Sequence, residues 1–431
     1  MRGQDKSLTQ RSFVLSACFV LAGLLAYVLM AVAKRSLSAE EFSRFSVFWS
    51  FGFFLTASVG APVEQELSRS VAYREAHGQR FDDVVRSATR LVGLLAAGAI
   101  VIALGAALSG RLNGLHANAP TTVALVLLLV GEAATSIVRG VLSGTRTTSA
   151  VGLLVAGQSG VRMLLVIVVV VLHPTSGLVA MAVATSSLTC LVFIRHTSTR
   201  NTGRLARSNE PGLSRSGVVR LVAAAPFSAI FSVGTPALAS VVSSDTDQNA
   251  IGDVLAALSL TSAPVLIAAA LQTALLPSLV RGLVEGGESA LRRTTRSIIA
   301  VVMSAAFLSS FVAAAIGPAV LQVLFGPTPA VGRWSLAAMT FAAGLLFLTN
   351  LLSPVCVARR SHGSVTRAWA VGALSMIGLI LIPGDFANRV AIALVGGATV
   401  VVASVVLSLR SVWRRLPANS SGVPSEPRLQ G

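Results

Sequence analysis

The stretch Thr121–Leu172, TTVALVLLLVGEAATSIVRGVLSGTRTTSAVGLLVAGQSGVRMLLVIVVVVL, decides the fold class. It contains two apolar runs, each long enough to cross a bilayer as a helix, on either side of a short polar turn at residues 144–149. Three charged residues, Glu132, Arg139 and Arg162, lie inside these runs. A charge near mid-bilayer costs several kcal/mol, so such side chains are usually paired or face a wet cavity. The stretch predicts a membrane hairpin with a polar centre.

The composition extends this interpretation to the whole chain. Of its 431 residues, 54% are hydrophobic and only 12% are charged, which is about half the charged fraction of a soluble protein. Apolar runs of spanning length recur along the sequence, and the fold class they predict is an all-α, polytopic membrane protein. We expect about twelve transmembrane helices, near residues 13–33, 45–63, 91–109, 121–141, 150–172, 177–194, 221–243, 251–275, 297–316, 334–355, 368–383 and 389–409.

The formal charge of +17 is distributed as a topology signal. Of the 34 Lys and Arg residues, 27 fall in loops on the side of the N-terminus and 6 in the opposite loops. Basic loops mark the cytoplasmic side, so we expect a multi-pass protein of the bacterial cytoplasmic membrane with both termini in the cytoplasm. The alternation also excludes a nucleic-acid partner, because the positive residues form no single patch.

The longest basic loop, residues 195–220, divides the twelve spans into two halves, as internal repeats do in many transporters. We expect an N-terminal six-helix bundle at 1–200, a cytoplasmic linker at 201–220 and a C-terminal six-helix bundle at 221–415. The remaining residues, 416–431, are rich in Pro, Ser and Gly and read as a disordered cytoplasmic tail. Prolines in spans seven and eight predict kinked or broken helices at Pro226, Pro236, Pro264 and Pro277.

No constellation of residues indicates an enzyme. The five histidines and three cysteines are scattered without metal-ligand spacing, and no Gly-Lys-Ser/Thr phosphate loop is present. We therefore expect no cofactor, with energy coming from a substrate gradient, a partner, or a gradient of H+ or Na+. Two acids after the first span, Glu40 and Glu41, could suggest the metal-bound sugar phosphate of a glycosyltransferase. A helix cap, with Ser38 three residues before Glu41, is the favoured reading.

The intramembrane charges give the candidate site. Glu132 and Arg162 each lie 15 residues from Thr147 at the hairpin turn, about 22 Å along the helix axis, so they should lie at matching depth and could form an ion pair. Arg139 lies two helical turns from Glu132 on the same face. One reading is a structural latch. The other is a cavity wall in which Glu132 is the proton-coupling acid and the two arginines attract an anionic substrate.

Further residues are weaker candidates. Gln158, Gln272 and Asn350 are polar residues within spans and could line the cavity. Asp253 opens the eighth span, where we expect it at the membrane interface.

Three short motifs resemble a known family. They are Leu37-Ser38-Ala39-Glu40-Glu41-Phe42-Ser43-Arg44-Phe45, Arg139-Gly140-Val141-Leu142-Ser143-Gly144 and Leu324-Phe325-Gly326. In layout and in these motifs the chain resembles the oligosaccharide flippases, the polysaccharide-biosynthesis branch of the multidrug/oligosaccharidyl-lipid/polysaccharide (MOP) exporter superfamily. Ser38 and Ser43 stand where that family commonly has glycines. The resemblance implies two six-helix bundles around a central cavity that opens to alternate sides, and export of an isoprenoid-diphosphate-linked glycan.

The predicted function is therefore a flippase for lipid-linked saccharides in surface polysaccharide or cell-wall glycan synthesis. Its expected partners are the lipid-linked saccharide, membrane lipids and glycan-assembly membrane proteins. A multidrug or cation exporter of the same superfamily is the first alternative. A membrane glycosyltransferase or glycan polymerase is another, although such enzymes usually have a large outer loop. A scaffold for a cell-wall assembly complex is the third alternative.

Overall fold

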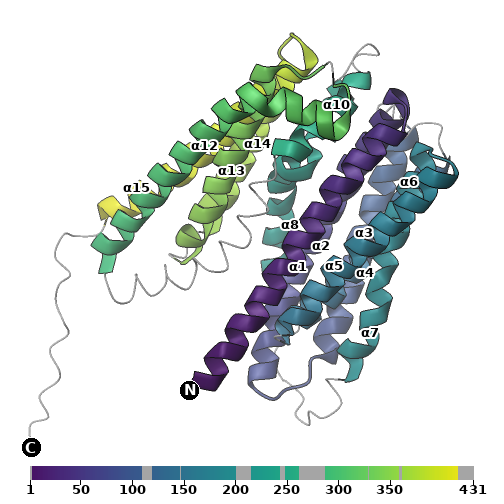
Figure 1. Ribbon diagram of the computed structural model, residues 1–431. Coiled ribbons are helices and arrows are strands. Elements are labelled where there is room, and N and C mark those ends of the chain that lie inside the picture. Colours follow the sequence, from purple (N-terminus) through teal and green to yellow (C-terminus); the bar gives the residue numbers. More distant parts are fainter. Residues whose placement is uncertain are drawn as a thin grey trace, which may run out of the picture.

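The computed structural model describes residues 2–108, 119–145, 147–199, 215–242, 248–261, 287–328, 330–358 and 362–415, and every regular element in these ranges is a helix (Figure 1). The N-terminal half contains α1 (Arg2–Ser36), α2 (Ala39–Ala76), α3 (Asp82–Leu108), α4 (Ala119–Gly144), α5 (Thr148–Leu172), α6 (Ser176–Thr185), η1 (Ser186–Thr189) and α7 (Cys190–Thr199). The C-terminal half contains α8 (Arg215–Ala229), η2 (Ile230–Gly234), α9 (Thr235–Val242), α10 (Gln248–Thr261), α12 (Gly287–Phe325), α13 (Arg333–Ala358), α14 (His362–Ile380) and α15 (Phe386–Arg415).

The predicted fold class is confirmed. Within the described ranges, 11 helical segments are long and apolar enough to cross a membrane, and they match eleven of the twelve predicted spans. The remaining predicted span, 251–275, begins as α10, and its continuation lies outside the described residues. Two helices run well beyond the prediction. The helices α2 and α12 continue through basic segments that would lie outside the apolar layer, because nothing in those segments breaks a helix.

The helices of the N-terminal half pack in an order that the hairpin does not predict. The helix α4 packs chiefly between α2 and α6, and α5 packs chiefly against α1, so the consecutive α4 and α5 touch only lightly. Close approach of α4 to α2 depends on small residues. A Cβ atom added at Gly144 would lie 2.6 Å from the Cβ atom of Val71, so only glycine fits there.

The helices α12–α15 meet the N-terminal half at one end of the molecule and diverge from it towards the other, whereas α8 packs on α2. In Figure 1, the bundle of α12–α15 lies beside α10 and the end of α1 at the top and separates from α1–α7 towards the end that carries the N-terminus. We call the end of the molecule at which α1 finishes, at Ser36, the closed end. Its core joins the halves directly, because Phe42 of α2 packs with Ile251 and Val254 of α10 in one apolar cluster.

Two spans change helix type near their middle. Between α8 and α9, residues 230–234 form the π-helical turn η2, flanked by the prolines Pro226 and Pro236. The predicted distortion at these two prolines is thus a local π-turn within a continuing helix. In the sixth span, α6 and α7 are joined by the 3₁₀ turn η1, which was not predicted. Pro264, Pro277, residues 201–214 of the linker and the 416–431 tail lie outside the described residues.

Candidate functional site

A central cavity of about 530 Å³ lies between the two halves of the molecule. Its walls come from α1 and α2 on one side and from α8, η2, α9, α10, α13, α14 and α15 on the other. Four aromatic side chains, Tyr27, Trp49, Phe231 and Trp369, line it. Among the described residues, no charged side chain does so.

Hydroxyl and amide groups supply the polar part of the wall. They are Ser228, Ser232, Thr235, Ser259, Thr261 and Asn350. The π-turn places several of them, because it rotates the chain between α8 and α9 relative to an α-helix. Thr235 keeps the turn closed by donating its hydroxyl hydrogen to the carbonyl oxygen of Ile230 at 2.9 Å. Apart from the phenol hydroxyl of Tyr27 on α1, the hydroxyl and amide groups of the wall therefore come from the C-terminal half of the chain.

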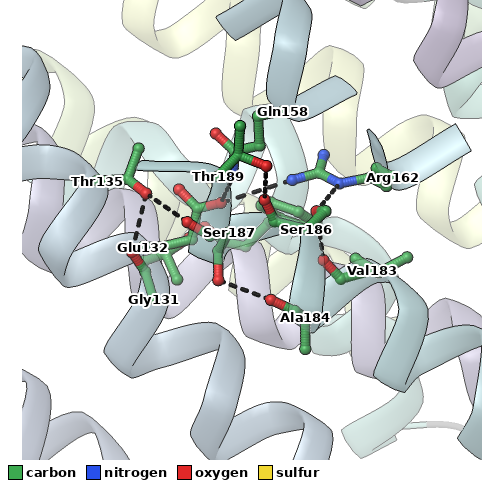
Figure 2. Close-up of polar contacts among 12 residues, drawn as sticks. Gly131, Glu132, Thr135, Gln158, Arg162, Val183, Ala184, Ser186, Ser187 and Thr189 are labelled. Atoms are coloured by element: carbon green, nitrogen blue, oxygen red, sulfur yellow. Dashed lines mark hydrogen bonds and ion pairs between the residues drawn. The ribbon is translucent and has the colours of Figure 1, made fainter. Parts of the chain in front are cut away.

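The ion pair between the predicted intramembrane charges is present. One Nη atom of Arg162 lies 3.5 Å from Oε1 of Glu132, and both side chains are about nine-tenths buried. The same carboxylate oxygen accepts a hydrogen bond of 2.6 Å from the amide of Gln158 (Figure 2). The other side of the guanidinium donates from Nε to the hydroxyl of Ser186 at 3.1 Å. The predicted proximity of Glu132 and Arg162 is thus confirmed, within a four-residue network.

The 3₁₀ turn forms one wall of this network. The hydroxyl of Thr135 donates to the carbonyl oxygen of Gly131 at 2.9 Å and approaches that of Ser187 at 3.3 Å (Figure 2). A Cβ atom at Gly131 would lie 1.8 Å from Oγ of Ser187, so glycine permits this approach. Sequence reasoning missed Thr135, Ser186 and Ser187. The signal was the polar run of residues 185–189 in the middle of an apolar span.

The Glu132–Arg162 network lies next to the wall of the central cavity. The guanidinium carbon of Arg162 lies 5.8 Å from the ring centroid of Trp49 and 5.2 Å from that of Phe53. Trp49 itself faces the cavity. One aromatic ring therefore separates the Arg162 charge from the cavity, at a distance where the ring and the cation attract each other.

Several predictions about the cavity need correction. Arg162 and Gln158 do not line it, because their polar groups are used by Glu132 and Ser186. Arg139 is neither in the cavity nor in the Glu132 network. Its Nε lies 3.0 Å from Oε2 of Glu64 on α2, and both side chains are about one quarter exposed.

The two other amide candidates have different outcomes. Asn350 lines the central cavity as predicted. Gln272 lies outside the described residues.

The closed end is held by contacts between the halves, which we call the closed-end seal. Nζ of Lys34 lies 2.7 Å from Oδ1 of Asp253, and both side chains are more than nine-tenths buried. The second oxygen of Asp253 accepts from the backbone N–H of Ala330 at 3.2 Å. Arg35 donates to the carbonyl oxygens of Val323 and Leu324 at the end of α12. The expectation that Asp253 lies at the interface with water is wrong, because Lys34 of α1 buries it.

The loop between α1 and α2 forms the helix N-cap that its sequence predicts. Ser38 is the N-cap of α2, and its hydroxyl accepts a hydrogen bond of 3.2 Å from the backbone N–H of Glu41. The carboxylate of Glu41 accepts from the N–H of Ser176 at the start of α6. Ser38 thus caps the start of α2, and Glu41 joins the start of α2 to the start of α6.

Comparison with known proteins finds sequence relatives without an established function. No family model matches the chain. It is 25% identical over 393 residues to proteins of Mycobacterium bovis and Mycobacterium tuberculosis described as uncharacterized, covering 88% of this chain and 87% of theirs. Another uncharacterized M. tuberculosis protein is 30% identical over 193 residues, 45% of this chain and 44% of its own.

Solved structures show which fold this is. An inward-facing multidrug resistance MATE family transporter of the MOP superfamily matches with a TM-score of 0.68 and 14% identity, over 94% of this chain and 98% of the other. An outward-facing structure of such a transporter gives 0.63 at 15% identity, covering 94% and 96%. A MOP superfamily transporter from Pyrococcus furiosus gives 0.63 at 14% identity, covering 94% and 95%. The chain therefore has the fold of MOP superfamily transporters.

Proposed function

We propose that this protein is an alternating-access transporter that moves an isoprenoid-diphosphate-linked saccharide from the inner to the outer leaflet of a bacterial cytoplasmic membrane. The observation that supports this most is the central cavity. In a fold known from MOP superfamily transporters, it combines aromatic rings with hydroxyl and amide groups, and no described lining residue carries a charge.

A saccharide fits this wall chemically. Sugar rings have apolar C–H faces that stack on aromatic side chains, and Trp49 and Trp369 face the cavity. Sugar hydroxyls need both donors and acceptors, which serine and threonine hydroxyls and the Asn350 amide supply. A pocket with mostly apolar walls and a few convergent polar groups is the usual form of a small-molecule site.

The Glu132–Arg162 pair gives a means of coupling the cycle to protons. While Glu132 is ionised, its charge compensates that of Arg162. Protonation of Glu132 removes that compensation and leaves a net positive charge one ring away from the cavity. A positive charge in a medium of low dielectric attracts the diphosphate of the substrate. Proton uptake and binding of an anionic substrate would thus favour each other.

The closed-end seal sets the direction of access in this state. With the termini in the cytoplasm, as the basic loops predict, the sealed end would face outward and loading would occur from the cytoplasmic side. Release outward would then require the Lys34–Asp253 pair to separate.

A cation exporter is the second candidate, supported by similarity of fold to a multidrug resistance MATE family transporter. A cationic drug would be bound best by a carboxylate in the cavity, and the described lining has none. This favours the saccharide. The three similar structures described above are transporters, and they give no support to a glycosyltransferase or polymerase.

The deciding experiment is deletion of the gene followed by lipid extraction. We expect a sugar-loaded polyprenyl carrier to accumulate on the cytoplasmic face and the surface glycan to decrease, with recovery on complementation. Unchanged carrier lipid and surface glycan would refute the flippase. Hypersensitivity to cationic dyes without carrier accumulation would instead support the exporter.

A variant tests the cavity itself. We expect Trp369→Ala to lower complementation of the deletion, because it removes a stacking surface from the cavity wall. Loss of one good aromatic contact corresponds to about a tenfold decrease in transport. Trp334→Ala is the matched control, because Trp334 lies on α13 with 71% of its surface exposed and does not line the cavity. Equal effects of the two substitutions would contradict the assignment.

A further inference from the structure

A second cavity, which we call the flank cavity, lies on the side of the N-terminal bundle. It has a volume of about 500 Å³ and is bounded by α3, α4 and α7. In Figure 1, α4 and α7 lie on the side of this bundle away from α12–α15. Its floor is apolar and includes Val85, Ile137, Val141 and Ile194. This position would place the flank cavity against membrane lipid.

Two arginines stand at the mouth of the flank cavity. Arg86 and Arg90 are exposed and lie four residues apart on α3, so they share one helix face. Neither forms an ion pair or hydrogen bond with another residue in the described part of the chain. The acids at the start of α3, Asp82 and Asp83, instead pair with other arginines at 3.0 and 2.5 Å. Asp82 also lines the flank cavity but is paired with Arg80, so the mouth carries two arginines side by side without a carboxylate partner of their own.

The position of the flank cavity along the membrane normal suits a lipid headgroup. Arg90 is followed directly by the apolar part of α3, so the two arginines stand where the chain enters the hydrocarbon layer. The charge distribution of the loops places this end of α3 in the cytoplasm. Anionic lipids of the cytoplasmic leaflet attract basic pockets between membrane helices.

We propose that the flank cavity binds an anionic glycerophospholipid. The phosphate lies between Arg86 and Arg90, and an acyl chain lies along Ile137 and Val141 of α4. A soluble anion would use the arginines but has no need of the apolar floor. A zwitterionic lipid would use the floor, but its own cation cancels the charge of its phosphate, so it would compensate the two arginines less well. An anionic lipid would contact both the arginines and the apolar floor.

The site has a consequence for α4. The floor residues Ile137 and Val141 lie on the same helix as Glu132 and Arg139. A bound lipid would therefore hold in place the helix that carries the charge network. The lipid site does not depend on which substrate is transported.

Native mass spectrometry of the purified full-length protein tests the proposal. Phosphatidylglycerol and phosphatidylcholine with the same acyl chains are each titrated onto the protein in detergent, and the bound lipid is counted. We expect phosphatidylglycerol to be retained more strongly, and Arg86→Gln/Arg90→Gln to weaken its binding by roughly 30-fold without changing that of phosphatidylcholine. Arg293→Gln/Arg296→Gln removes the same charge from exposed positions on α12 and should change neither.

Two further measurements distinguish a lipid site from a surface charge effect and from a site for soluble anions. Thr89→Trp places a large ring at the mouth of the flank cavity while keeping both arginines, and it should also weaken phosphatidylglycerol binding. Inorganic phosphate is added as a probe of a soluble-anion site. Equal retention of the two lipids, equal effects of the two double variants, or competition by millimolar phosphate would each overturn the proposal.

Discussion

One carboxylate oxygen of Glu132 receives both the Arg162 guanidinium and the Gln158 amide. The same guanidinium also holds Ser186 of the 3₁₀ turn. At the scale of single residues, the site is thus a closed set of donors and acceptors drawn from three spans. A set of this kind is stable when complete and costly when one member is removed, because the others remain buried without a partner.

Arg162→Gln should lower the free energy of unfolding by about 3 kcal/mol, the usual cost of breaking a buried ion pair from one side. Adding Glu132→Gln should restore much of that stability, because no unpaired charge then remains. Thermal unfolding of the purified protein in detergent measures both changes. If the double variant is stable but does not transport, the pair is a working site. If it is stable and transports normally, the pair is only a latch.

Glu64→Gln/Arg139→Gln is the matched control for these variants. This pair also joins two helices, but its side chains are about one quarter exposed. Removing both of its charges should change stability by no more than about 1 kcal/mol. A loss as large as that of Arg162→Gln would show that burial does not distinguish the two pairs.

Gly131→Ala tests the approach of α4 to the 3₁₀ turn. The new methyl group would overlap Ser187, so we expect a loss of about 1–3 kcal/mol in the free energy of unfolding, as for other overpacked cores. Gly93→Ala on α3 is the control, because a Cβ atom there meets nothing within 4 Å. It should be neutral or slightly stabilising. Equal unfolding temperatures for the two variants would contradict the close approach.

At the scale of elements, the site depends on two irregular turns, one in each half. The 3₁₀ turn brings Ser186 and Ser187 to the charge network, and the π-turn brings Ser232 and Thr235 to the central cavity. Pro236 has no N–H, so the carbonyl of Ser232 cannot receive the α-helical hydrogen bond. The proline therefore favours the π-turn.

Pro236→Ala should allow a regular α-helix to form through residues 230–236. We expect transport to fall, because the hydroxyl groups would rotate away from the cavity, whereas thermal stability should be unchanged or higher. Pro318→Ala in α12 is the control, since Pro318 also lies inside a helix but does not line the cavity. Transport and unfolding are measured on the same preparations. Undiminished transport by Pro236→Ala would show that the π-turn does not position the site.

Particular residues show how far the sequence could predict this arrangement. Equal spacing of Glu132 and Arg162 from the hairpin turn predicts their meeting, because depth in a membrane follows directly from helix rise. Spacing does not say which helices are neighbours. The pairing of Arg139 with Glu64 follows from the packing of α4 on α2, which small residues such as Gly144 determine. The 3₁₀ turn was missed because span prediction weighs mean hydropathy, which the serines barely lower.

At the scale of the whole molecule, the closed-end seal joins the two halves, and α12–α15 diverge from α1–α7 beyond it (Figure 1). Asp253 binds Lys34 of α1 and the backbone before α13, so it holds both halves at once. Separation of the halves at this end has to break these contacts together.

Asp253→Asn should therefore shift the protein towards a conformation that is open at the end closed in this structure. With the native cysteines removed, Ser259→Cys in the cavity wall reports accessibility to an impermeant thiol reagent added outside intact cells. We expect labelling several times faster in the Asp253→Asn background than in its absence. Glu40→Gln is the control, because Glu40 pairs with Arg44 on its own helix. Equal labelling rates in all backgrounds would mean that the pair does not hold the halves together.

The closed-end seal also concerns the cell when no substrate is present. A central cavity open at both ends would breach the permeability barrier of the membrane, and at the closed end that barrier is formed by Lys34, Asp253, the backbone contacts of Arg35 and the apolar cluster around Phe42. A variant with a weakened seal would leak small solutes at rest. Selection against such leakage would preserve these three charged residues even where the transported cargo has changed.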